Sequence, residues 1–63
     1  MNIRISEDAT NGKEQVIIER QAGDSDSTLE NFARSLPGMR KMVHQTDAYG
    51  KVVLDRIVVT LDS

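Results

Sequence analysis

The feature that most constrains this chain is an apolar run of eleven residues, K-V-V-L-D-R-I-V-V-T-L, from Lys51 to Leu61. It is rich in β-branched residues and follows Gly50, so it predicts a strand. Alternation along a strand gives one face Val53, Ile57, Val59 and Leu61, and the other face Val52, Leu54 and Val58. Because both faces are mostly apolar, we expect both to be covered, the second one by another copy of the chain.

The length of the chain supports the same expectation. Its 63 residues allow a single domain over residues 1–63, and such a core rarely supplies more than about 3–5 kcal/mol without staples or partners. There is no cysteine to form a disulfide, so oligomerisation is the remaining route to stability. No apolar run approaches the length of a membrane span, and the chain has no signal-peptide pattern. We therefore expect a cytoplasmic protein without a membrane partner.

The dipeptide Asn11-Gly12 lies between two apolar segments and predicts a type I′ hairpin with a two-residue loop. That loop sets Arg4 opposite Glu19 as an ion pair on one face. It gives the other face four apolar residues, with Ile5 opposite Ile18: Ile3, Ile5, Val16 and Ile18.

A helix is predicted to follow. The segment Ser27-Thr28-Leu29-Glu30 matches a capping box, in which the serine and glutamate side chains bond each other's backbone N–H groups. The residues after it place an apolar stripe at helical spacing on one side: Leu29, Phe32, Ala33 and Leu36.

Pro37-Gly38 leaves two arrangements open for the next segment. If proline stops the helix near Leu36, residues 39–46 form a strand that turns through residues 47–50 and pairs with the last strand, giving ββαββ. If the helix restarts, it runs to about His44 and the order is ββαβ. Either way we predict an α+β fold with one helix packed on one face of a mainly antiparallel sheet.

Charge is distributed unevenly along the chain, whose net charge is −2. Residues 1–30 hold three basic and seven acidic side chains, a net of −4, while residues 31–51 hold four basic and one acidic, a net of +3. The basic residues are the candidate nucleic-acid contacts: Arg34, Arg40, Lys41 and Lys51. We do not expect nucleic acid as the main partner, because the chain is acidic overall and has no recognition motif.

The other polar clusters have structural explanations. Residues 24–27, D-S-D-S, match turn and helix-capping chemistry and lack the frame of a calcium loop. His44 is the sole histidine, and no motif supplies a nucleophile for it; Asp47 is placed to orient it only if the segment is helical. We expect no catalytic, cofactor or metal site, and no enzyme activity.

Asp55-Arg56 interrupts the apolar strand on both faces. The pair either marks a salt bridge between two copies of the strand or is satisfied within the chain. We predict a small protein–protein interaction or regulatory module that forms a homodimer or higher oligomer through its C-terminal strand and also binds another protein. The predicted interface is Val52, Leu54, Asp55, Arg56 and Val58. A nucleic-acid-binding protein is the alternative.

Overall fold

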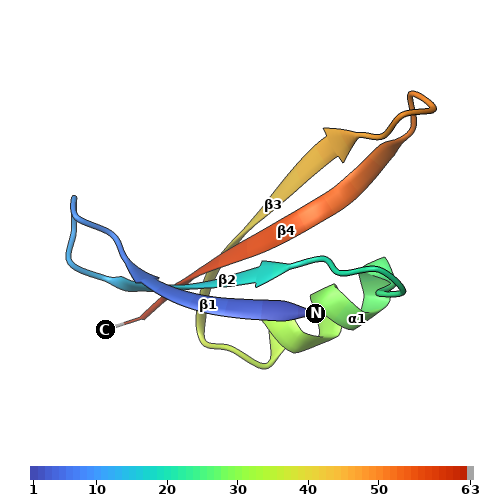
Figure 1. The fold of residues 1–63 in the computed structure, drawn as a ribbon. Coiled ribbons are helices and arrows are strands. Elements are labelled where there is room, and N and C mark those ends of the chain that lie inside the picture. The colour runs from blue at the N-terminus through green and yellow to red at the C-terminus, as the bar shows by residue number, and fades with distance from the viewer. Residues whose placement is uncertain (63) are drawn as a thin grey trace.

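The computed structural model describes residues 1–62 as one sheet and one helix. In chain order the elements are β1 (Asn2–Glu7), β2 (Glu14–Glu19), α1 (Asp26–Arg34), β3 (Gly38–Thr46) and β4 (Val52–Leu61). The strands are antiparallel throughout and lie in the order β1-β2-β4-β3 (Figure 1). The ββαββ form of the predicted α+β fold is confirmed. The alternative ββαβ order is wrong, because the chain becomes extended directly after Pro37.

The core lies between α1 and the two inner strands, β2 and β4 (Figure 1). The predicted helical stripe is confirmed, since Leu29 and Ala33 are fully buried while Phe32 and Leu36 pack against the core. The strands contribute five buried residues: Val16, Ile18, Leu54, Ile57 and Val59. Edge strands β1 and β3 receive little cover from the helix.

The helix begins two residues earlier than predicted. Ser25, not Ser27, is the N-cap, and its hydroxyl accepts a hydrogen bond from Thr28 N–H at 3.2 Å. The capping box predicted at residues 27–30 is therefore wrong. Ser25 is favoured because an earlier start places Asp26 in the first turn, where a carboxylate stabilises the helix dipole.

The β1–β2 hairpin has the predicted faces but a different register. Ile5 lies opposite Val16 rather than Ile18, a shift of two residues, which preserves the face of every side chain. The loop is wider than a type I′ turn: only Gly12 has positive φ, and Gly12 N–H bonds the Asp8 carbonyl at 2.7 Å. The Asp8 carboxylate and the Asn11 side chain accept backbone N–H groups within the loop, which stabilises this wider turn.

A β-bulge in β4 changes which side chains reach the core. His44 pairs with Leu54 and Val43 with Arg56, so Asp55 is an extra residue on β4. The inserted residue reverses the alternation, and Leu54, expected opposite to Ile57, shares the core face with it and is only 2% exposed. The expected grouping of Val53 with Ile57 and of Leu54 with Val58 is therefore wrong.

Arg20 holds the bulge in place. Its backbone N–H bonds the Asp55 carbonyl at 3.0 Å, and its Nε donates to the Leu54 carbonyl at 2.6 Å. The same guanidinium donates to the Asp24 carbonyl at 2.5 Å and pairs with the Asp26 carboxylate. One side chain thus joins the bulge, the loop after β2 and the first turn of α1.

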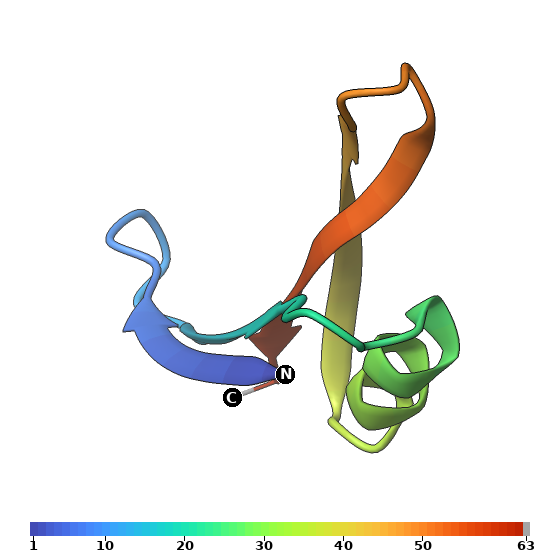
Figure 2. The ribbon, with the colours of Figure 1, turned by 45° about the vertical axis from the view of Figure 1, so that its right-hand side comes forward.

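The β3–β4 hairpin extends past the other elements as an arm and rises steeply from β1 and β2 (Figure 2). Its predicted turn is confirmed, with Gly50 N–H bonded to the Asp47 carbonyl at 3.1 Å. At its base Gly38 has φ 142°, and a Cβ there would lie 2.0 Å from the Thr60 carbonyl oxygen. Only glycine allows β3 to start so close to β4.

Candidate functional site

The side of the sheet away from α1 is the candidate interaction surface, and we call it the open face. Val16 and Ile18 point into the core, so Ile17 between them points to the opposite side. Ile17 lies opposite Val58 of β4, and Val58 lies opposite Lys41 of β3. On the other flank, Arg4 of β1 lies opposite Ile17. One row across all four strands therefore has an apolar centre and a cation at each end.

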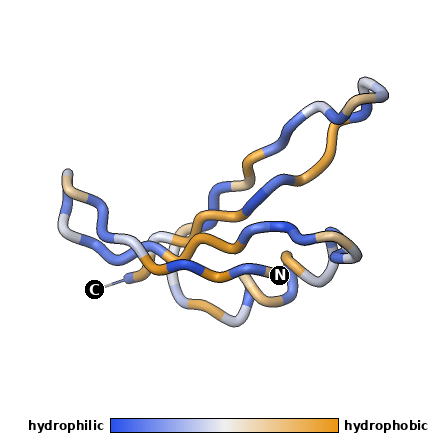
Figure 3. Tube along the Cα trace, in the orientation of Figure 1, coloured by the Kyte–Doolittle hydropathy of each residue, from blue (hydrophilic) through white to orange (hydrophobic). Residues whose placement is uncertain are grey.

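The neighbouring rows differ, because their centres are polar, with Glu19 beside Arg56 in one and Gln15 beside Thr60 in the other, and only their β3 ends are apolar. Val43 of β3 lies beside Arg56 on the open face, and Met39 lies beside Thr60. Met39 is 79% exposed, whereas Ile17, Val43 and Val58 are partly buried by their neighbours. The hydropathy-coloured trace in Figure 3 shows apolar residues along β4, β2 and β1. The open face thus has a small apolar centre at Ile17 and Val58 with polar residues around it, and within residues 1–62 no helix covers it.

The polar margin of the open face is ordered by side-chain contacts. The predicted pairing of Arg4 with Glu19 is confirmed, with Arg4 Nε 2.9 Å from Glu19 Oε1, although the two residues are diagonal neighbours. Asn2 Nδ2 donates to the same oxygen at 3.1 Å, and Gln15 Nε2 donates to Thr60 Oγ1 at 3.3 Å. These hydrogen bonds restrict the polar side chains that surround Ile17.

The five predicted interface residues do not share one surface. Val58 lies at the centre of the open face and Arg56 on its margin, where Arg56 Nε is 3.3 Å from Asp55 Oδ2 of the bulge. Val52 is exposed on the arm, on the helix side of the sheet. Leu54 lies in the core beneath the loop held by Arg20.

The position of β4 inside the sheet limits how it can meet a second copy. β2 pairs with residues 56–60 of β4 along one side and β3 pairs with β4 along the other, so at Arg56 neither edge is free. Of the two alternatives for Asp55-Arg56, strand-to-strand pairing of two β4 copies at these residues does not fit this sheet, and the two side chains pair within the chain. The face of β4 that carries Val58 remains open to another molecule.

Ile17, at the centre of the open face, was not among the residues predicted from the sequence. Its signal was present, because Val16-Ile17-Ile18 is an uninterrupted apolar run in a strand. A strand with one wet face would carry a polar residue at the middle position. β2 and β4 thus each carry an apolar residue in the middle of the open face, Ile17 and Val58.

The candidate nucleic-acid contacts do not gather into one patch. Arg34 lies in the last turn of α1 and Lys51 at the tip of the arm. Arg40 and Lys41 are adjacent on β3, so their side chains point to opposite faces of the sheet. A continuous basic surface is not formed by these four residues.

The other clusters take part in local structure. Asp47 Oδ1 accepts the N–H groups of Tyr49 and Lys51 at 2.9 Å each. His44 lies on a strand, so the helical segment that would let Asp47 orient it is not formed. Within residues 1–62, no group of three or more histidine or acidic side chains is arranged to hold a metal ion. The single helix of this region is also too short to cross a membrane.

The Asp24 carboxylate is held by two hydrogen-bond donors. The amino group of Met1 lies 2.7 Å from Asp24 Oδ2, which also accepts the Gln21 N–H at 2.9 Å. The bond from this ammonium, followed by the Gln21 N–H, lowers the pKa of Asp24 below its ordinary value of 3.8. This contact ties the start of β1 to the loop before α1, so its role is structural.

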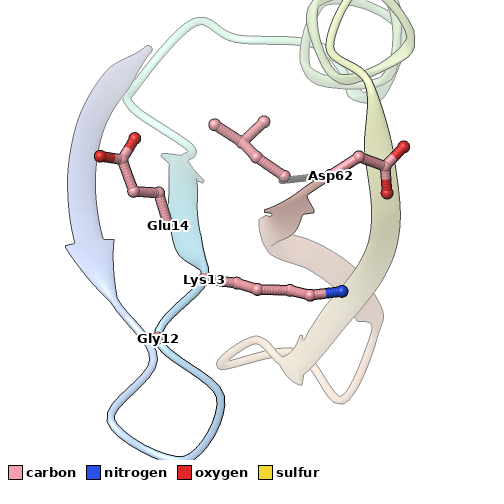
Figure 4. A pocket seen from close by; sticks show the side chains of 5 residues that line it. Gly12, Lys13, Glu14 and Asp62 are labelled. Atoms are coloured by element: carbon pink, nitrogen blue, oxygen red, sulfur yellow. The ribbon is translucent and has the colours of Figure 1, made fainter.

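A pocket of about 270 Å³ lies where the β1–β2 loop meets the end of β4 (Figure 4). Its lining is Gly12, Lys13, Glu14, Leu61 and Asp62. The Lys13 side chain extends across the opening, and the Glu14 side chain points away from Lys13 (Figure 4). Within the described residues, the charged side chains of this pocket form no ion pair with one another, and they provide no arrangement of acid, base and nucleophile.

Comparisons of the chain with protein-family models, with curated proteins and with solved structures give no match.

Proposed function

We propose that this chain is a non-enzymatic protein-interaction module that self-associates by packing the open faces of two copies together. The observation that carries the proposal is an apolar pair in the middle of the uncovered face of the inner strands. Ile17 and Val58 are paired side chains at the centre of a face that α1 does not cover. Apolar side chains at the centre of a surface with a polar margin are the usual anatomy of a protein interface.

The size of the face supports a second copy as its occupant. The two longest dimensions of the molecule are 39 and 22 Å, so a broad side covers at most about 860 Å², close to the roughly 800 Å² per partner of a stable interface. A homodimer would therefore use most of this face. It would also add buried area to a core that a chain of this length can build only in part.

Charge on the margin also supports self-association. The open face carries both signs, with Arg4 bonded to Glu19 and Arg56 beside Asp55. In a two-fold dimer the same patch meets itself, so a patch of one sign would repel its copy. A patch with both signs around an apolar centre avoids that repulsion. We place this assembly in the cytoplasm, which suits a cysteine-free chain.

The test replaces Val58 with lysine and measures mass by sedimentation equilibrium. Val58→Lys puts a charge into the centre of the interface and should reduce the mass to that of a monomer or unfold the chain. Ile5→Lys is the matched control: Ile5 is 72% exposed and lies on the helix side of edge strand β1. It should leave the mass unchanged.

Circular dichroism separates loss of assembly from loss of folding. If Val58→Lys unfolds the chain, Ile17→Ser should give a folded chain with weakened association, because it removes apolar area at the same contact without adding charge. A wild-type chain that is monomeric at every concentration would refute the proposal. So would a Val58→Lys variant with unchanged mass and unchanged stability.

A further inference from the structure

Strand β3 leaves one edge of the sheet free. It is the last strand in the order β1-β2-β4-β3, is nine residues long, and has mostly exposed side chains. No other element of residues 1–62 pairs with its outer side. A free edge of this length offers a row of backbone donors and acceptors to another extended chain.

Hydrogen bonds at the two ends of β3 identify the backbone groups that face outward. Asp47 N–H bonds the Lys51 carbonyl at 2.9 Å, and the Pro37 carbonyl accepts Asp62 N–H at 3.4 Å. In an antiparallel pair, residues alternate between bonding the partner strand and facing away from it. The odd-numbered residues of β3 therefore bond β4, while the N–H and C=O groups of the even-numbered residues 40, 42, 44 and 46 face outward.

The same edge carries unpaired positive charge. Arg40 and Lys41 form no ion pair within the described residues, and β3 contains no acidic side chain. Arg40 flanks the edge on the helix side, and Lys41 flanks it on the open face. An extended segment added at this edge would meet a cation on either face.

We propose that the β3 edge binds an extended acidic segment of another protein as a fifth strand of the sheet. The positive charge of the edge favours an acidic partner, although the chain as a whole is negative. Pairing two copies of β3 would instead bring four cations onto one ladder with no anion among them. The outward backbone groups of this edge and Arg40 lie outside the contact between Ile17 and Val58, whereas Lys41 borders both surfaces. Peptide binding is therefore tested at the backbone and at Arg40, where it can fail independently of dimerisation.

The register of β3 specifies the chemistry of the added strand. In an antiparallel arrangement, the residues opposite Arg40, Lys41 and His44 should be acidic, and those opposite Met39, Met42 and Val43 should be apolar. The peptide T-T-E-V-I-E-E-V satisfies this pattern from Thr46 back to Met39. Its isoleucine lies opposite Met42, so the isoleucine N–H faces β3, whereas the valine before it, opposite Val43, has an N–H that faces away.

The experiment measures binding of this peptide, labelled with a fluorophore, by fluorescence anisotropy. Two N-methylated forms provide a matched pair. Methylation of the isoleucine N–H should weaken binding by at least about tenfold, because it removes a ladder bond and introduces a clash. Methylation of the preceding valine should change affinity by less than about threefold, because that N–H points to solvent. The two forms have the same side chains, the same charge and one N-methyl group each. Binding by charge attraction alone would therefore give them equal affinity.

A charge exchange tests the register. Arg40→Glu should weaken binding of the acidic peptide, and the peptide with lysine in place of the glutamate opposite Arg40 should restore it. Arg40 is exposed on the edge, and circular dichroism checks that the variant is folded.

Four results would overturn the proposal. They are no binding of the peptide at millimolar concentration, equal loss with both N-methylated forms, displacement of the peptide by a single-stranded oligonucleotide, and dissociation of a wild-type dimer by the peptide. The third would assign the edge to nucleic acid and the fourth to a second copy of the chain.

Discussion

Replacement of Gly38 by alanine should strongly destabilise the fold, because the start of β3 has no space for a side chain. Gly38 has φ 142°, and a methyl carbon at this position would lie 2.0 Å from the Thr60 carbonyl oxygen and 2.9 Å from Leu61 Cα. Both contacts are with the backbone of β4, so no side-chain rotation relieves them. In the alanine variant, β3 and β4 must therefore move apart at the base of the arm.

The size of the effect follows from two costs. A left-handed backbone conformation costs a residue with a Cβ about 1–2 kcal/mol, and forcing an extra carbon into a packed site costs about 1–3 kcal/mol. Together they amount to about 2–5 kcal/mol, against about 3–5 kcal/mol of total stability for a chain of this length. Gly38→Ala should therefore remove about two fifths or more of the stability of the folded chain.

Gly50→Ala is the matched control for the backbone cost alone. Gly50 has φ 80° in the turn of the same hairpin, and a Cβ there would meet nothing within 4 Å. Urea unfolding followed by circular dichroism, at one fixed protein concentration, should show Gly50→Ala destabilised by about 1–2 kcal/mol. Gly38→Ala should lose clearly more. Equal midpoints for the two variants would refute the argument from close approach.

Three further predictions concern the bulge and the loop before α1. Leu54→Ala should destabilise the protein by about 2–5 kcal/mol and Val53→Ala by much less, and equal losses in urea unfolding would contradict the bulge. Arg20→Lys should lose most of the stability that Arg20→Ala loses, because an ammonium cannot reach the Leu54 carbonyl and Asp26 together; wild-type stability for the lysine variant would argue against this. Because the pKa of Asp24 is lowered in the folded state, its contribution is present above pH 3.8 and is lost as pH falls through the lower folded value. Asp24→Asn should therefore differ from wild type at neutral pH and converge with it in strong acid, and a difference that is constant with pH would contradict the contact with Met1.

Sequence patterns predicted the first two strands, the helix and the last strand, and left two arrangements for the segment between Pro37 and the last strand. Pro37 and Gly38 separate a helical spacing of apolar residues from a strand, and the tertiary structure agrees with that boundary. The faces of β1 and β2 were also predictable, since a two-residue error in register leaves every side chain on its own face. Helix spacing likewise identified the buried stripe that contains Leu29 and Ala33.

Details that depend on local hydrogen bonds were not predictable from pattern. Asn11-Gly12 predicts a two-residue turn, but the Asp8 and Asn11 side chains accept backbone N–H groups within a wider loop and stabilise that loop instead. In β4, a period of two cannot reveal an inserted residue, so Leu54 was placed on the wrong face. The interruption of the apolar run by Asp55 was the visible sign of the bulge.

The candidate site was predictable only in part. Val58 lies beyond the bulge on the part of β4 that keeps regular alternation to Leu61, and its place on the face opposite the core was predicted correctly. Ile17 was missed because the first hairpin was analysed for one apolar face only. The free edge of β3 depends on strand order, which the spacing of residues along the chain does not specify.

The most direct test of the central claim is an isotope-filtered NOE experiment on a mixture of labelled and unlabelled wild-type chains. If two open faces pack together, methyl groups of Ile17 and Val58 in labelled chains should show contacts to protons of unlabelled chains. Methyl groups of Leu54 and Ile57, which lie in the core, should show none. Contacts from Ile3 and Ile5 alone, or no contacts between chains at millimolar concentration, would contradict the account.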